Sequence, residues 1–446
     1  MRRPSVPSGL VEGIVRREVL PWALLGFTLG LVEGATVAVL VKKGYASAAP
    51  ATAVNFAVAL VSGAPALANV VSFAWANLAH GRARIGVLAA IQAAFALAVG
   101  LIAMAPGGPA GLLLTIRAVI LARMLWTGVL TVRATVWTAN YPRHVMARVT
   151  GRMVMVGAIG MALAALLAGW VLDRNAGQAR WLYVLAALLG LLAAARYRAV
   201  RVRREFRLLA AEAGEGRAGS AFSLGMLREI LRADPQFRRY MFWMSMYGSG
   251  NLMINGQLVV LFSDRLSLSG LQQILALTVV PLALMPLCLP WWARLFDRGH
   301  IIEYRARQCW VLVAGTAVMA AAVIGRTETL VWLGAAIIGF GMAGANLGWN
   351  LGHNDFAPLG RVQHYMGVHV TLTGVRGLIA PPLGMLCHEL LERWHAGAGG
   401  YALLIPLGMV SCGALGFVGM RSALRTLPAG SQRSDQEPGD KARSSD

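Results

Sequence analysis

Residues 20–41 read LPWALLGFTLGLVEGATVAVLV, a run with a single charged side chain, Glu33. As an α-helix rising about 1.5 Å per residue, this run is long enough to cross the hydrocarbon layer of a membrane, which is about 30 Å thick. Residues 153–172 form a second such run, with no charged side chain. Both runs predict membrane-spanning helices, so lipid rather than water is the expected solvent of the fold.

The composition predicts many such helices. Of the 446 residues, 57% are hydrophobic and 14% are charged, and the mean hydropathy is +0.60. One aqueous core cannot bury this much apolar surface, so we expect an all-α membrane protein with about twelve transmembrane helices. The first six lie near 20–41, 53–74, 85–105, 111–136, 153–172 and 181–195. The last six lie near 240–262, 271–291, 307–325, 329–352, 366–387 and 401–420.

An internal repeat groups these helices into two pseudo-symmetric bundles of six. Residues 75–80, WANLAH, follow the second span, and residues 292–297, WARLFD, follow the eighth. The fourth and tenth spans are also followed by similar residues, namely Trp137, Asn140 and Gly151 in the first half and Trp349, Asn354 and Gly367 in the second. Two parallel repeats of six spans leave this kind of pattern in a sequence.

The chain therefore divides into four parts, which are an N-terminal six-helix bundle over 1–195, a basic cytoplasmic linker over 196–239, a C-terminal six-helix bundle over 240–421 and a disordered cytoplasmic tail over 422–446. The linker begins RYRAVRVRREFR, which favours a solvated tether between the bundles; the alternative is that it binds anionic lipid headgroups. Apolar residues at helical spacing over 222–231 predict a helix that lies along the membrane interface.

The distribution of charge predicts the orientation of the chain. The formal net charge is +21, a value that by itself suggests nucleic-acid binding. The arginines, however, are concentrated in alternate loops and at both termini. By the positive-inside rule, this distribution places both termini in the cytoplasm of a multi-pass protein, and we expect a bacterial inner membrane. We expect no nucleic-acid partner.

The sequence has no motif typical of an enzyme or a metal site. It contains no phosphate-binding G-x-x-x-x-G-K-[ST] loop, no H-E-x-x-H motif and no polar segment long enough for a catalytic domain. The four cysteines lie in apolar runs without metal-ligand spacing. We therefore expect no enzymatic activity, no metal and no cofactor.

A short motif after the eighth span indicates a family. Residues 293–299 read ARLFDRG, which resembles the signature G-x-L-x-D-R-x-G-R-R that the major facilitator superfamily carries after the second helix of each half. In the first copy His80 replaces the aspartate, whereas Gly81, Arg82 and Arg84 keep the basic character. The chain resembles this family over nearly its whole length. The resemblance implies a secondary transporter whose first, fourth, seventh and tenth helices line a central cavity.

The resemblance also implies a cytoplasmic gate in these loops. A carboxylate at a helix end can pair with arginines and helix termini when such a gate is shut. Asp355 lies in a polar cluster at the cytoplasmic end of the tenth span, where it either joins the gate or caps a helix. The candidate gate residues are His80, Arg82, Arg84, Asp297, Arg298 and Asp355, with Asp297 and Arg298 as the expected latch. The alternative is that these side chains only cap short cytoplasmic turns.

Ionisable residues inside apolar spans are candidates for the transport mechanism, because a charge in lipid needs a partner or a wet cavity. Glu33 is our candidate for proton coupling, and the alternative is that it reaches water at the outer end of its span. Arg123 in the fourth span needs a buried carboxylate or an anionic substrate, whereas Arg133 and Arg117 are expected to reach the two membrane surfaces. In the resembled fold, Glu33 and Arg123 would share one cavity.

Polar side chains recur every four residues in two further spans. Tyr247, Asn251 and Asn255 lie in the seventh span, and Asn346 and Asn350 lie in the tenth. This spacing places each set on one helical face, which either binds a polar solute or forms hydrogen bonds with neighbouring helices. With two arginines added, the predicted substrate cavity comprises Arg123, Tyr247, Asn251, Asn255, Asn346, Asn350 and Arg376.

These residues favour a proton-coupled secondary transporter for a small polar solute, and the arginines suggest an anion. The expected partners are the lipid bilayer, the solute and protons, and the chain is expected to act as a monomer. One alternative is a drug or toxin exporter of the same fold, although residues 157–162, GAIGMA, lack the proline found in the fifth helix of such exporters. A second alternative is a membrane receptor that does not transport.

Overall fold

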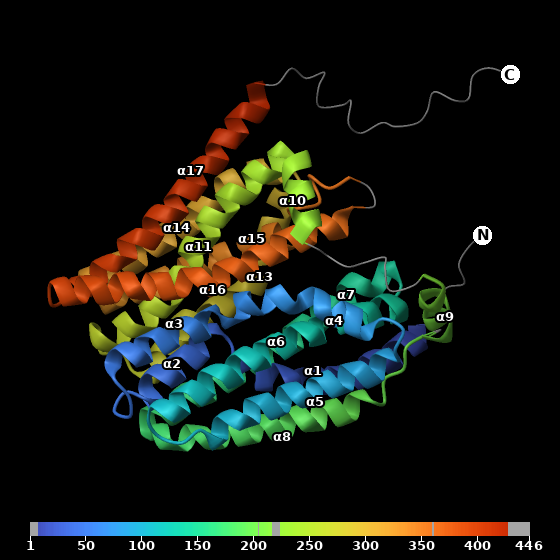
Figure 1. The fold of residues 1–446 in the computed structure, drawn as a ribbon, viewed down its shortest axis with the longest axis horizontal. Helices are drawn as coiled ribbons and strands as arrows, with labels where there is room; N and C mark the ends of the chain where they lie inside the picture. Colours follow the sequence, from blue (N-terminus) through green and yellow to red (C-terminus); the bar gives the residue numbers. More distant parts are fainter. Residues whose placement is uncertain (1–7, 204, 216–223, 359–360, 427–446) are drawn as a thin grey trace.

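The computed structural model describes residues 8–203, 205–215, 224–358 and 361–426, and every regular element among them is a helix (Figure 1). The first group of helices comprises α1 (Ser8–Gly30), α2 (Gly34–Gly44), α3 (Ala51–Leu67), α4 (Ser72–Ala79), α5 (Arg84–Leu101), α6 (Pro109–Asn140), α7 (Arg143–Arg174) and α8 (Ala179–Tyr197). Two helices follow in the linker, α9 (Glu205–Glu215) and α10 (Leu224–Ala233). The second group comprises α11 (Pro235–Asp264), α12 (Gly270–Ile274), α13 (Val280–Phe296), α14 (Ile301–Ile324), α15 (Glu328–Leu351), α16 (Val362–Trp394) and α17 (Leu404–Thr426).

Most of these helices are suited to a membrane. Among the described residues, ten helical segments are long and apolar enough to cross one, and the bent pair α1–α2 makes an eleventh. Helix α11 has 30 residues, but polar residues such as Arg238, Arg239 and Asn251 lower its hydropathy. With α11 included, the segments follow the order of the predicted spans. The predicted all-α, multi-pass membrane fold is confirmed.

The helices pack as two groups (Figure 1). One apolar core is built mainly by α1–α8, and two further cores belong to α10–α17. The first core also includes Val259 and Ile274 of the second group, so apolar contacts join the groups. In Figure 1 the groups lie together at the end that holds α2 and diverge towards the end that holds α9 and α10. We call these ends the far side and the linker side.

A network of polar side chains joins the two groups on the far side. Lys42 of α2 pairs with Asp264 of α11 at 2.8 Å and also donates to Asn55 of α3 at 2.9 Å. Glu389 of α16 accepts hydrogen bonds from Asn55 at 2.7 Å and from Thr52 at 3.1 Å. These five residues form the far-side network. Its contacts between the groups join residues at least 222 positions apart in the sequence.

The backbones of the two groups also approach closely. A Cβ atom on Gly63 of α3 would lie 2.6 Å from the carbonyl oxygen of Gly377 on α16, so only glycine fits there. Asp173 at the end of α7 accepts hydrogen bonds from the backbone N–H groups of Gly270 at 2.6 Å and Leu271 at 3.0 Å, at the start of α12. A carboxylate at a helix N-terminus is stabilised by the helix dipole. The far side is thus closed by packing and by charge.

The first predicted span differs from the expectation of one continuous helix over 20–41, which is wrong. Helix α1 ends at Gly30, α2 begins at Gly34, and the two are bent by 43°. Gly34 has a φ of +33°, a backbone conformation that other residues rarely adopt. Glu33 stands at the N-cap of α2 in an extended conformation. The helix breaks because this glycine tolerates the turn and because Glu33 binds a residue of α6.

The linker and the chain end also differ from the expectations. The linker holds two helices, of which α9 was not expected, and α10 covers the described part of the stretch 222–231 in which a helix was predicted. Residues 222–223 of that stretch lie outside the described residues. Helix α17 extends to Thr426, into the stretch predicted to be a disordered tail. The rest of that tail, 427–446, also lies outside the described residues.

Helix α10 is attached to the start of α16. The hydroxyl group of Tyr365 donates to Asp234, just after α10, at 3.1 Å, and Arg361 pairs with Glu229 at 3.5 Å. Both side chains of the second pair are more than half exposed, so that pair adds little stability. Asp234 also accepts from the backbone N–H of Phe237 at 2.8 Å and so caps α11. One end of the linker is therefore fixed to the second group.

Candidate functional site

The break in the first span brings Glu33 to Arg123 of α6. A carboxylate oxygen of Glu33 accepts a charged hydrogen bond from Nη1 of Arg123. Arg123 is buried, and the side chain of Glu33 is 27% exposed. Sequence analysis left a carboxylate or an anionic substrate as the partner of Arg123, and in this structure the partner is a carboxylate. The predicted proton carrier and a predicted cavity residue thus form one ion pair.

A second charged cluster lies in the first group and was missed from the sequence. Glu18 of α1 is 1% exposed and accepts a hydrogen bond from the indole N–H of Trp137 at 2.7 Å. The guanidinium group of Arg133 lies 4.1 Å from the ring centre of Trp22 and 4.2 Å from that of Trp137. Arg133 is thus held between two indoles by cation–π contacts, which the sequence analysis did not predict. The signal was the i, i+4 spacing of Glu18 with Trp22 and of Arg133 with Trp137.

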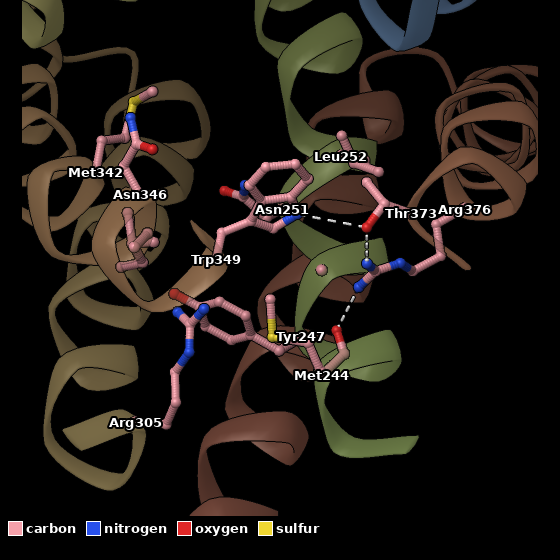
Figure 2. Close-up of a pocket in the computed structure, with 13 residues that line it drawn as sticks. Met244, Tyr247, Asn251, Leu252, Arg305, Met342, Asn346, Trp349, Thr373 and Arg376 are labelled. Atoms are coloured by element: carbon pink, nitrogen blue, oxygen red, sulfur yellow. Dashed lines mark hydrogen bonds between the residues drawn. The ribbon is translucent and has the colours of Figure 1, made fainter. Parts of the chain in front are cut away.

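The second group contains a cavity of about 270 Å³ between α11, α14, α15 and α16 (Figure 2). Four of the residues predicted for a central substrate cavity, Tyr247, Asn251, Asn346 and Arg376, line this cavity within the second group. Asn346 is exposed, so the cavity is open to the outside beside this residue. The other lining residues are Met244, Gly248, Leu252, Arg305, Leu312, Met342, Ala345, Trp349 and Thr373.

Three predicted cavity residues do not line this cavity. Arg123 lies in the other group of helices. The side-chain amide of Asn255 donates to the carbonyl oxygen of Asn251 at 3.5 Å, and that of Asn350 donates to the side-chain oxygen of Asn346 at 2.6 Å. Both asparagines therefore donate a hydrogen bond along their own helices in this structure.

Arg376 of α16 is buried at the cavity wall, and its hydrogen bonds go to neutral acceptors. Its Nη1 donates to the carbonyl oxygen of Met244 at 2.5 Å, its Nη2 donates to the hydroxyl oxygen of Thr373 at 2.6 Å, and its Nε donates to the carbonyl oxygen of Leu372 at 3.2 Å. Figure 2 shows two of these bonds on the side of the cavity opposite Arg305. The side chain is thus fixed in position, but its charge is not neutralised by any of these groups.

Arg305 of α14 is a cavity residue that sequence analysis did not select. Its side chain is fully buried, and Nη1 donates to the side-chain oxygen of Gln308 at 2.9 Å. Its Nε and Nη2 have no hydrogen-bond partner in the described part of the chain. Cζ is the nearest atom to a Cβ built on Gly348, at 2.7 Å, so the guanidinium plane lies face-on to this glycine. Arg305 was counted only as a loop charge because it lies close to the start of its helix.

On the linker side, the first signature copy is bound by the linker helix α9. The backbone N–H of Arg84 donates to Glu205 at 2.7 Å, and that of Gly81 donates to Glu212 at 2.8 Å. The Arg84 side chain also forms an ion pair with Glu212. Burial alone would raise the pKa of Glu212, but the bonds from Gly81 and Arg84 outweigh it and lower this pKa below its ordinary value. His80 is half-buried beside this contact and Arg82 is exposed.

The second signature copy is arranged differently. Asp297 and Arg298 are exposed, and neither side chain forms an ion pair with a described residue, so the expected latch is not made in this structure. Asp355 accepts a hydrogen bond from the backbone N–H of Ile301 at 2.6 Å and so caps α14. Glu205 binds the start of α5 in the same way. In both groups, a carboxylate from elsewhere caps the helix that follows the signature loop.

Comparisons with known proteins agree with this architecture. Residues 20–381 match the model of the family described as Major Facilitator Superfamily. Among solved structures, a variant of the nucleoside transporter NupG has a TM-score of 0.68 and 13% identity and covers 92% of this chain and 99% of its own. A D-xylose-proton symporter has the same TM-score and identity, covering 92% and 97%, and the POT family transporter PepTSo has 0.70 and 9%, covering 95% and 100%. None of the curated proteins matches the chain.

Proposed function

The chain belongs to the major facilitator superfamily, and from this premise we propose that it is a proton-coupled secondary transporter that moves a small polar solute across the membrane by alternating access. The observation that carries the proposal is the Glu33–Arg123 ion pair at the break in the first span. In the proposed topology, the linker side faces the cytoplasm of a bacterial inner membrane. The closed far side and the diverging linker side then correspond to an inward-facing state of a monomer.

The ion pair supports proton coupling for an electrostatic reason. A carboxylate and a guanidinium group inside a membrane are tolerated as a pair because their charges cancel. Protonation of Glu33 removes the negative charge, whereas Arg123 keeps its proton and is left to attract water or an anionic group. Since Glu33 lies between α1 and α2, the same event releases the bent span from α6. Proton binding thereby changes the contacts of a helix that has to move.

The test is a measurement of proton movement that depends on a solute. Purified protein is reconstituted into liposomes that contain a pH-sensitive dye, and small polar solutes are added one at a time. We expect at least one solute to move protons with the wild-type protein. Glu33→Gln should abolish this movement while it preserves counterflow of the same solute. Arg117→Gln, an exposed position on the helix that carries Arg123, is the matched control and should behave as the wild type.

Other outcomes separate the rival functions. If no solute in a broad panel moves protons, proton-coupled transport is contradicted; if in addition no solute shows counterflow, a receptor is favoured. Proton movement only with apolar cationic drugs would favour an exporter, which the two arginines of the cavity argue against. An unchanged pH dependence of transport in Glu33→Gln would remove Glu33 from the coupling role.

A further inference from the structure

The cavity of the second group carries positive charge without a counterion. Arg305 and Arg376 both line it, and both are buried. None of its described lining residues has a carboxylate, and neither arginine forms an ion pair with a described residue. Arginine keeps its proton at any pH at which proteins are folded. Two uncompensated charges within membrane-spanning helices are costly, so this cavity favours a negatively charged occupant.

The two arginines of the cavity form different sets of hydrogen bonds. Arg376 uses Nε, Nη1 and Nη2 on neutral oxygens, so it contributes charge from a fixed position. Within the described part of the chain, Arg305 donates only from Nη1, and its Nε and Nη2 have no hydrogen-bond partner there. Nε and Nη2 form one edge of the guanidinium group, and their two parallel N–H bonds match the two oxygens of a carboxylate. A buried donor without an acceptor costs about 1–3 kcal/mol, and an occupant that supplies both acceptors removes this cost.

The remaining walls indicate the rest of the occupant. Figure 2 shows the ring of Tyr247 beside the Arg305 guanidinium group, and Trp349 between the two arginine-bearing walls. Met244, Met342 and Leu252 add apolar surface. Asn251 and Asn346 are the amides of the lining. The volume of about 270 Å³ lies just below the range typical for drug-sized ligands.

We propose that the cavity binds a small organic carboxylate, whose carboxylate group is held by Arg305 and Arg376 and whose apolar body packs against Tyr247 and Trp349. This proposal rests on the proposed function in that it names the solute class of the transporter. It excludes neutral sugars and cationic drugs as the principal solutes. Arg305 is the specificity-determining residue, because its charge lies at the cavity and its Nε and Nη2 have no hydrogen-bond partner among the described residues.

The test measures binding and needs no transport. Thermal unfolding of the purified full-length protein in detergent is recorded with matched pairs of a carboxylate and its amide, such as benzoate with benzamide and butyrate with butyramide. A ligand that binds the folded state raises the melting temperature by mass action. We expect at least one carboxylate to raise it and the matching amide to leave it unchanged. Calorimetric titration then gives the affinity of that carboxylate.

Variants of α14 provide the decisive comparison. Arg305→Gln should weaken binding of the carboxylate by about ten- to a hundredfold, the loss expected for a hydrogen bond to a charged group. Arg307→Gln, an exposed position two residues further along the helix, should leave the affinity unchanged. If Arg305→Gln does not fold, Arg305→Lys keeps the charge but lacks the two-donor edge, and its affinity should also fall.

Several results would overturn the proposal. Amides that bind as tightly as the matching carboxylates would show that charge is not recognised, and stabilisation by inorganic phosphate alone would assign the cavity to a free anion. Unchanged carboxylate affinity in Arg305→Gln would remove this residue from the site. Carboxylate binding without any solute-dependent proton movement would contradict the proposed transport function and leave this site intact, so the two failures are distinguishable.

Discussion

Replacing Glu389 with alanine should open the far side of the molecule. Glu389 accepts two hydrogen bonds from the first group of helices, from Thr52 and from Asn55. A buried hydrogen bond to a charged group contributes about 1.5–3 kcal/mol, and because Glu389 is only half-buried we take about 1 kcal/mol for each bond. Glu389→Ala should therefore favour the open far side by about 2 kcal/mol, or about 30-fold in the ratio of closed to open molecules.

Distances between spin labels on the far side measure this ratio. Exposed Gln178, after α7, and exposed Thr327, before α15, are replaced by labelled cysteines in a chain from which the four native cysteines have been removed. The wild-type protein should give mainly the short distance of the closed far side. Glu389→Ala should add a population at longer distance, because the two groups separate more readily there.

The matched control is Glu392→Ala on the same helix. Glu392 also accepts two hydrogen bonds, from the backbone N–H groups of Gly397 at 2.7 Å and Gly399 at 2.8 Å, but both lie within the second group. Its loss should leave the distance distribution unchanged. If Glu389→Ala gives the wild-type distribution, or if Glu392→Ala opens the far side equally, the reasoning about the far-side network is refuted.

Three further predictions concern the packing around the site. Glu212 has a lowered pKa, so its contact with Arg84 should persist above the ordinary glutamate pKa of about 4.3 and weaken as the pH falls below it. Hydrogen exchange of the backbone amides of α9 measures the strength of this contact. Glu212→Gln should raise the exchange rate of α9 even at neutral pH. Gly63→Ala should lower the melting temperature, because the new Cβ would lie 2.6 Å from the carbonyl oxygen of Gly377. We expect it to lower the free energy of unfolding by about 1–3 kcal/mol. Gly86→Ala, whose Cβ would meet open space, is the control. Trp137→Phe should lower the free energy of unfolding by about 1–3 kcal/mol, because it removes the indole N–H that donates to buried Glu18. Replacement of the exposed Trp170 by phenylalanine should have little effect on thermal unfolding. Equal melting temperatures for the two variants would contradict a stabilising role of the cluster around Glu18.

Much of the fold could be predicted because lipid imposes a simple pattern on the sequence. Apolar runs located the helices, and charges that interrupt them located Glu33 and Arg123. The break beside Glu33 was missed because Gly34 reads as an ordinary helical glycine until its φ is known. Lys42, Asp264 and Glu389 could not be paired from the sequence, because their contacts join positions that lie far apart in the chain.

Only some of the residues predicted for a substrate cavity line the cavity of the second group, for a geometric reason. Four residues of α-helix turn through about 400°, so a stripe at i, i+4, i+8 drifts by about 40° at each step. Tyr247 and Asn251 face the cavity, and Asn255 has turned away from it. The same drift separates Asn346 from Asn350. Arg305 was overlooked because a basic residue near a helix start is typical of a loop that sets topology.

The two linker helices together limit how wide the molecule can open. Glu205 and Glu212 fasten α9 to the first group, and Asp234 fastens the end of α10 to the second. Residues 213–233 separate the Glu212 anchor from the Asp234 anchor, and α10 takes up the last ten of them. The length of the linker thus sets an upper limit on the distance by which the two groups of helices can separate. Release of α9 from the first group would lengthen this connection. Glu205 and Glu212 therefore control how far the two groups of helices can separate on the linker side.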